Sequence, residues 1–115
     1  MPQEETRLDL LRGTLDLLVL QTLRTLGPQH GYGIARRIEQ VTGHAILLNQ
    51  GTIYASLVRL VHRGWIKSQW GTSDNNRRAK YYDLTRAGRL RLHDDADYWR
   101  KLSGIMGRVL DAPDH

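Results

Sequence analysis

The chain has 115 residues, no cysteine and a formal net charge of +5 at pH 7. This length allows one domain with a modest core, and the lack of cysteine excludes disulfides, thiolate metal sites and cysteine nucleophiles. No apolar run approaches the roughly 20 residues that a membrane-spanning helix needs, and residues 1–12 lack the apolar core of a signal peptide. We therefore expect a cytoplasmic protein without a membrane partner.

The positive charge is concentrated in one part of the chain. Between Arg59 and Arg91 there are nine bases and two acids, whereas the rest of the chain has eight bases and ten acids. A basic segment of this kind is typical of a surface that faces a polyanion such as nucleic acid. A solvated surface has the same composition, so charge alone leaves both interpretations open.

Three helices are predicted in the first half of the chain, over residues 11–26, 32–42 and 49–64. In each of them apolar residues recur at helical spacing, and a glycine stands at or just after the end. Asn49 has a side chain suited to cap the third helix. The apolar residues that set this spacing are Leu11, Leu15, Leu18, Val19, Leu23, Leu26, Ile34, Ile38, Val41, Ile53, Leu57, Leu60 and Val61.

After the third helix the pattern changes from helical to strand-like. Ile66, Ser68 and Trp70 alternate with polar residues, which predicts a half-buried strand, and residues 81–84 predict a returning strand. The intervening residues 71–80 (GTSDNNRRAK) are polar and typical of turns. The sequence therefore predicts a hairpin with a long basic tip.

A last helix is predicted after Thr85, a suitable N-cap residue, and runs to about Leu110. At 1.5 Å for each residue it would be roughly 39 Å long. Gly88, Gly104 and Gly107 weaken it, because a glycine inside a helix costs about 1 kcal/mol relative to alanine. We therefore expect this helix to need tertiary or quaternary contacts.

The second and third predicted helices form a helix-turn-helix pair. In such a pair the third helix would enter the major groove of DNA while the second braces it. The connection over residues 43–48 is longer than in the minimal motif, which favours a winged variant. We predict a mainly α fold with a small β-hairpin: a winged helix-turn-helix domain at residues 8–84 and a long C-terminal dimerisation helix at residues 85–111.

Polar and basic side chains gather on the outward face of the third helix and on the hairpin. Small and hydroxyl residues suit a helix end that approaches base edges and phosphates, and the bases suit phosphate contacts. Each part alone could be a solvated surface, so it is their combination that favours DNA. The predicted DNA-binding residues are Tyr32, Asn49, Gln50, Thr52, Tyr54, Ser56, Arg59, Arg63, Arg77, Arg78 and Lys80.

Four segments have a characteristic order and spacing. They are LLRGTLDLLVLQTL (10–23), GPQHGYGIARRIEQ (27–40), LNQGTIYASLVRLVHRGWI (48–66) and RRAKYYDLTRAG (77–88). Together they resemble the PadR family of bacterial transcriptional regulators, in the compact subfamily with one long C-terminal helix. The resemblance implies a winged-helix domain that dimerises through its N- and C-terminal helices and binds operator DNA. It also implies repression, and release by a small-molecule inducer in several members.

The resemblance also assigns roles to residues. It places Thr52, Tyr54, Ser56 and Arg59 on the recognition helix and Arg77, Arg78 and Lys80 on the wing. Tyr32, within HGYGI, belongs to the bracing helix. Two interpretations of its side chain stay open at this point: a phosphate contact, or a half-buried aromatic that fixes the helix pair.

The long last helix is the natural dimer element, because a two-fold operator needs two domains held about 34 Å apart. The predicted dimer contacts are Leu15, Leu102, Ile105, Met106 and Val109. Trp99 has two interpretations. It is either a dimer-core residue or, by resemblance to compact members of the family, part of a flat pocket at the interface where paired rings stack on planar ligands. The candidate partners are therefore double-stranded operator DNA, a second copy of the chain and a small aromatic or drug-like inducer.

Signals for catalysis or metal binding are weak. His93 and Asp97 are four residues apart, but ion pairing on a solvated helix face explains this spacing better than a metal site. No nucleophile–base pair or carboxylate pair stands out, so we expect no enzyme, no metal and no cofactor. The alternatives to an operator-binding regulator are a nonspecific nucleic-acid-binding winged helix and an adaptor module whose basic segment contacts an acidic protein.

Overall fold

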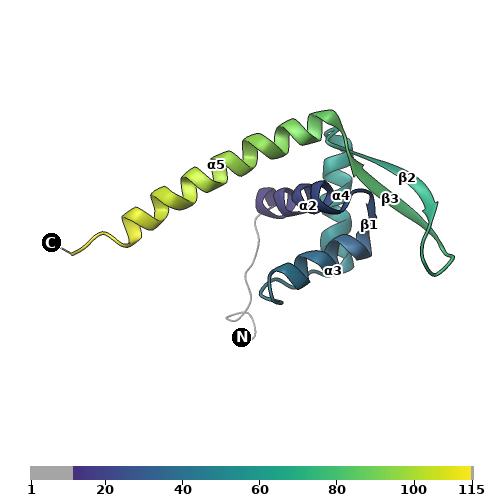
Figure 1. Ribbon diagram of the computed structural model, residues 1–115, viewed down its shortest axis with the longest axis horizontal. Helices are drawn as coiled ribbons and strands as arrows, with labels where there is room; N and C mark the ends of the chain where they lie inside the picture. Colours follow the sequence, from purple (N-terminus) through teal and green to yellow (C-terminus); the bar gives the residue numbers. More distant parts are fainter. Residues whose placement is uncertain (1–11, 115) are drawn as a thin grey trace.

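The computed structural model describes residues 12–114, which form four helices and a small sheet whose hairpin projects to one side (Figure 1). The helices are α2 (Arg12–Leu26), α3 (Gly31–Val41), α4 (Gln50–His62) and α5 (Arg86–Leu110). The strands are β1 (Gln29–His30), β2 (Ile66–Thr72) and β3 (Arg78–Leu84), which form an antiparallel sheet in the order β1-β3-β2. Leu11 and the predicted domain start at residue 8 lie outside the described residues.

Local signals set the helix ends, as predicted. Asn49 caps α4 by accepting a hydrogen bond from the amide three residues later at 2.7 Å, and Thr85 caps α5 in the same way at 3.0 Å. The Nδ1 atom of His30 does the same for α3 at 3.0 Å. Gly43 and Gly64 follow α3 and α4 with positive φ angles of 61° and 77°, a conformation that glycine adopts without strain.

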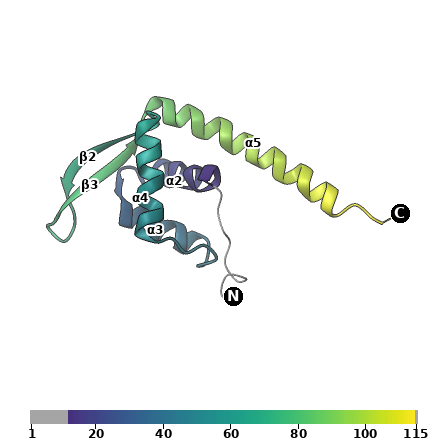
Figure 2. The ribbon, with the colours of Figure 1, turned by 180° about the vertical axis from the view of Figure 1, so that it is seen from behind.

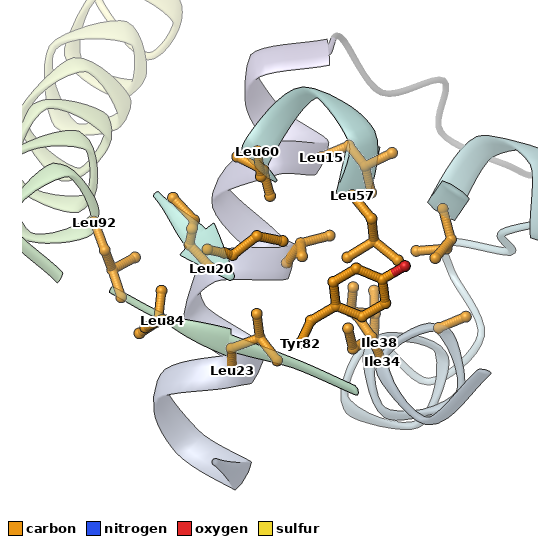
Figure 3. Close-up of a cluster of buried hydrophobic side chains, with 14 of the residues drawn as sticks. Leu15, Leu20, Leu23, Ile34, Ile38, Leu57, Leu60, Tyr82, Leu84 and Leu92 are labelled. Carbon is orange, nitrogen blue, oxygen red and sulfur yellow. The ribbon is translucent and has the colours of Figure 1, made fainter. Parts of the chain in front are cut away.

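The core lies where α2, α3 and α4 meet the sheet (Figure 3). Leu20, Ile34 and Leu60 are at most 1% exposed. Val61 and Val41 do not join them, since they are 39% and 68% exposed. Val61 lies outside the face of α4 that packs on the core, and Val41 is the last residue of α3. Neighbouring elements therefore leave both side chains partly exposed.

The hairpin has longer strands and a shorter turn than the sequence predicts. β2 and β3 pair along their whole lengths, so residues 73–77 form the turn rather than residues 71–80. Gly71 pairs with Ala79 and therefore belongs to β2; the ring of Tyr81 lies over it, and a Cβ atom at this position would come within 2.9 Å of the ring. Asn76 takes the left-handed conformation expected in this turn, with a φ angle of 60°.

The strand β1 is absent from the sequence prediction. Gln29 and His30 pair with Tyr82 and Tyr81 of β3. Two residues are too few to show a strand alternation, so no periodic signal marks them. The pairing joins the start of α3 to the hairpin by backbone hydrogen bonds and thereby fixes the bracing helix relative to the wing.

Only the first turns of α5 pack on the domain, and the rest of the helix extends away on the side opposite the hairpin tip (Figures 1 and 2). Its buried residues are Gly88 and Leu92. A Cβ atom at position 88 would lie 1.9 Å from the carbonyl oxygen of Trp65. Gly88 therefore does more than weaken the helix, because its missing side chain lets α5 lie against the turn after α4. Within residues 12–114, no helix has both the length and the apolar character needed to cross a bilayer.

Candidate nucleic-acid interface

A groove of about 780 Å³ lies between the start of α3, the first half of α4 and the hairpin. It brings together three segments that are far apart in the sequence. The predicted DNA-binding residues on its walls are Tyr32, Gln50, Tyr54, Arg77, Arg78 and Lys80. The structure thus gathers six of the eleven predicted residues around one concave surface.

The groove is predominantly basic. Four of the side chains that line it are cationic (Arg36, Arg77, Arg78 and Lys80), and one, Asp74, is acidic. Both predicted recognition residues of α4 in the groove are exposed, with Tyr54 at 63%. A concave basic surface beside an exposed helix N-terminus suits a phosphate backbone.

Tyr32 stands on the rim of this groove and not inside the helix pair. Its side chain is 57% exposed, and its hydroxyl accepts a hydrogen bond from Nη1 of Arg36 at 3.1 Å. This exposure supports the phosphate-contact interpretation over the half-buried one. Arg36 received no role from the sequence; its position one helical turn after Tyr32 is the signal that would have found it.

The wing holds its cations against an aromatic ring. Trp70 lies directly across the sheet from Lys80, whose Nζ atom is 5.5 Å from the ring centroid, and the guanidinium carbon of Arg78 lies 4.6 Å from it. Arg78 and Lys80 are in β3, and only Arg77 lies in the turn, so the predicted basic tip is wrong for two of its three residues. Trp70 is 55% exposed and orients both cations. Trp70 can contact these cations only in the observed strand register. The sequence prediction missed this register because it assigned residues 71–80 to the turn.

Asn49 and Thr52 lie outside the groove. The side-chain oxygen of Asn49 caps α4 at 2.7 Å from the amide of Thr52, so this oxygen is already engaged. Both residues border a separate shallow depression of about 390 Å³, together with Arg59. Both are exposed at the start of α4, and their predicted contacts with DNA stay predictions.

Ser56 does not lie on the outward face of α4 as predicted. Its side chain is fully buried, and its Oγ atom donates a hydrogen bond to Oδ1 of Asp16 at 2.6 Å. The sequence pattern placed it outside because serine is polar. The structure corrects this because α2 supplies a buried acceptor.

Arg59 shares the same acceptor. Its Nε and Nη2 atoms donate to the two carboxylate oxygens of Asp16 at 3.1 and 2.7 Å, and the side chains are only 23% and 14% exposed. The hydrogen bonds to Asp16 raise the pKa of Arg59, although partial burial opposes this. Arg59 is therefore engaged within the protein, and its predicted phosphate contact stays a prediction. Asp16, the one acid of α2, was missed.

Arg63 lies at the other end of α4 from the groove. It is the C-cap residue of the helix, and its guanidinium carbon lies 5.2 Å from the centroid of the Trp65 ring. The structure therefore separates it from the other cations that the sequence grouped with it. Its predicted phosphate contact stays a prediction.

The residues predicted to form a dimer fall into two groups. Leu15 is 4% exposed and belongs to the core of its own chain, so its burial does not support the predicted contact with a second copy, which stays a prediction. Ile105, Met106 and Val109 are 48%, 50% and 68% exposed on α5, and Leu102 is partly buried. Trp99, the proposed ligand contact, is 50% exposed on the same helix.

Two of the three acids of α5 form local ion pairs. Asp95 and Asp97 pair with Arg91 and Lys101, each at 3.0 Å and at four-residue spacing. Among the residues that the structure describes, no three His, Cys, Asp or Glu side chains are grouped so as to hold a metal ion.

Comparisons with known proteins place the chain in a family. The model of the Transcriptional regulator PadR-like family matches residues 19–94, more than half of the chain. A PadR family transcription regulator from Clostridium difficile is 32% identical, with a TM-score of 0.72 over 84% of this chain and 97% of that chain. A transcriptional regulator from Clostridium thermocellum is 27% identical, with a TM-score of 0.75 over 84% and 90%.

A third structure contains DNA. Bacillus subtilis PadR in complex with operator DNA is 29% identical, with a TM-score of 0.61, over 70% of this chain and 45% of that chain. The present chain therefore spans less than half of that protein. The helix-turn-helix pair, the three-stranded wing and the long last helix agree with these relatives and confirm the predicted fold class. The chain belongs to the PadR-like family of transcriptional regulators.

Proposed function

We propose that this regulator binds double-stranded operator DNA through the basic groove and the exposed first half of α4. The observation that carries the proposal is the convergence of both helix N-termini and the wing on one cationic surface. The operator complex of the Bacillus subtilis relative supports it. In this arrangement α4 enters the major groove, and α3 braces it from behind.

The exposed side chains fall into two groups, one that contacts bases and one that contacts phosphates. Gln50 and Tyr54 stand on the groove side of the first turns of α4, where they reach base edges. Arg77 and Arg78 on the wing, with Tyr32 on α3, contact phosphates, which fix the register of the protein without discriminating between bases. Sequence selectivity therefore comes from α4, and most of the salt-dependent affinity comes from the wing.

The protein acts as a homodimer through α5. Tyr98, Leu102, Ile105 and Val109 follow one another at intervals of four, three and four residues, the spacing of a helix–helix seam. All but Leu102 are about half exposed or more, and within residues 12–114 only the first turns of α5 pack on other elements. A second copy would cover this seam and hold two domains at the spacing of an operator.

The regulator represses transcription, and a planar aromatic ligand at the dimer interface releases it. Trp99 supports this part of the proposal, since its ring is half exposed next to the apolar seam of α5. Quenching of tryptophan fluorescence by planar aromatic compounds tests it. The quenching should vanish in Trp99→Ala, which retains Trp65 and Trp70; quenching that survives would place the ligand elsewhere.

Selection of bound fragments from the host's genomic DNA tests operator binding. We expect enrichment of an inverted repeat, with an affinity at least about 10³-fold above that for random duplex. Binding that is strong but indifferent to sequence would indicate a nonspecific nucleic-acid-binding protein. Failure to bind any duplex at low salt would instead favour an adaptor that contacts an acidic protein.

The wing has a separate test. The double variant Arg77→Ala/Arg78→Ala should weaken binding to every duplex and reduce the magnitude of the negative slope of log affinity against log salt concentration by about 2. The matched control is Arg24→Ala/Arg108→Ala, which removes the same charge from exposed positions on α2 and α5. Equal effects of the two double variants would contradict the wing assignment.

A further inference from the structure

We infer that Asp16 is a positioning residue for operator selectivity, which holds the recognition helix through Ser56 and Arg59 while neither of these two contacts DNA. The inference rests on the proposed function. It assigns α2 a part in recognition that the groove alone does not suggest.

The contact is directional. Ser56 and Arg59, one helical turn apart on α4, together donate three hydrogen bonds to the two oxygens of one carboxylate, at 2.6, 2.7 and 3.1 Å. Within residues 12–114 these are the side-chain hydrogen bonds that join α2 to α4. Apolar packing between helices is less directional than charge-assisted hydrogen bonds to a carboxylate. The carboxylate thus fixes the rotation of α4 about its own axis.

The contact lies on the side of α4 away from the groove. At about 100° for each residue, Ser56 and Arg59 point nearly opposite to Gln50 and Tyr54. A rotation of α4 by about 10° would displace a side-chain tip at a helix radius of about 5–6 Å by about 1 Å. Hydrogen bonds to base edges do not survive a shift of this size, because their donor–acceptor distances lie within about 2.7–3.2 Å.

Loss of the contact therefore has a distinctive effect on binding. Base contacts on α4 depend on its orientation, whereas phosphate contacts on the wing carry no sequence information. Releasing Asp16 should lower the preference for the operator over other DNA and leave the salt dependence unchanged. If Arg59 instead bound a phosphate, its removal would weaken binding to all duplexes and reduce the salt slope by about 1.

The experiment compares two probes: the duplex most enriched by genomic selection and a scrambled duplex of the same length. The full-length variants are Ser56→Ala, Asp16→Asn, Arg59→Gln and the double variant Asp16→Asn/Arg59→Gln. Asp95→Asn is the control, since it breaks an exposed ion pair of α5. Ser56→Ala is decisive because a fully buried hydroxyl has no direct access to DNA, and it stays informative if Asp16→Asn fails to fold.

We expect each single variant to lose about tenfold in operator affinity, with scrambled-duplex affinity and the salt slope unchanged. The double variant should lose no more than either single variant. Affinities are compared for the folded, active fraction, found by circular dichroism and stoichiometric titration. An unchanged preference in folded Ser56→Ala and Asp16→Asn overturns the inference and leaves the proposed function intact. A wild-type protein without any operator preference overturns both.

Discussion

The helices and sheet of residues 12–84 and the long helix α5 differ in how far their apolar side chains are buried. In the domain, Leu60 and Ile34 are fully buried by elements of the same chain. On α5, Ile105 and Val109 stay 48% and 68% exposed. Within residues 12–114, the apolar core is covered by the packed helices and sheet, whereas these residues leave the apolar side chains in the second half of α5 largely exposed. Four variants test this difference.

The largest effect is expected in the domain core. Leu60→Ala should lower the free energy of unfolding by about 2–5 kcal/mol, because it removes buried methyl groups and leaves a cavity. Urea denaturation followed by circular dichroism measures this. The neighbouring exposed residue provides the control: Val61→Ala should change the same quantity by less than about 1 kcal/mol. Similar losses in both variants would mean that the packing of α4 is described incorrectly.

The next effect is expected at the proposed seam of α5. Ile105→Asp would place an unpaired carboxylate in the interface and should raise the dissociation constant of the dimer about a hundredfold. Light scattering across a dilution series measures it. Ser103→Asp, exposed on the same helix but outside the seam, should leave the dimer intact. A monomeric wild-type protein would refute the proposed dimer.

The junction between the two regions is tested by a pair of glycines. Gly88→Ala should destabilise the protein by about 1–3 kcal/mol, because its Cβ atom would collide with the Trp65 carbonyl. Gly104→Ala meets nothing within 4 Å in the chain and should stabilise α5 by up to about 1 kcal/mol. Thermal unfolding distinguishes them. A destabilised Gly104→Ala would reveal a close helix approach in the dimer.

The smallest effect is expected for an exposed tryptophan of the domain. Trp70 differs from Trp99 in that cations of its own chain lie over its ring. Trp70→Leu should reduce affinity for any duplex by about two- to fivefold, the loss of a cation–π contact of about 0.5–1 kcal/mol. Fluorescence anisotropy with labelled duplex measures the change. No change would mean that Arg78 and Lys80 are positioned without the ring.

Much of the fold is predictable because its signals are local. Asn49 and Thr85 start their helices by capping an amide three residues away, and glycines end the preceding helices. The limits lie where a contact is distant in sequence. Ser56 and Arg59 look like outward polar residues until Asp16, 40 and 43 residues earlier, is placed beside them.

The candidate site shows the same division. That α4 and a basic hairpin belong together follows from their order in the chain. The depth of the groove does not, since it depends on the two-residue pairing of β1 with β3. The contact of Arg78 with the ring of Trp70 also depends on the pairing register of β2 and β3. That register is set by a turn of five residues, whereas composition alone predicts a turn of ten.

The close approach at Gly88 has a consequence for operator architecture. Gly88 is the third residue of α5, which has 25 residues and is about 37 Å long, so a small change of helix angle at the contact with Trp65 moves the far end by a larger distance. If α5 tilts by about 5° at the contact between Gly88 and Trp65, its far end moves by about 3 Å, which is close to the 3.4 Å rise of one base pair. In the proposed dimer, the missing side chain of one glycine thus helps to set how many base pairs separate the two half-sites.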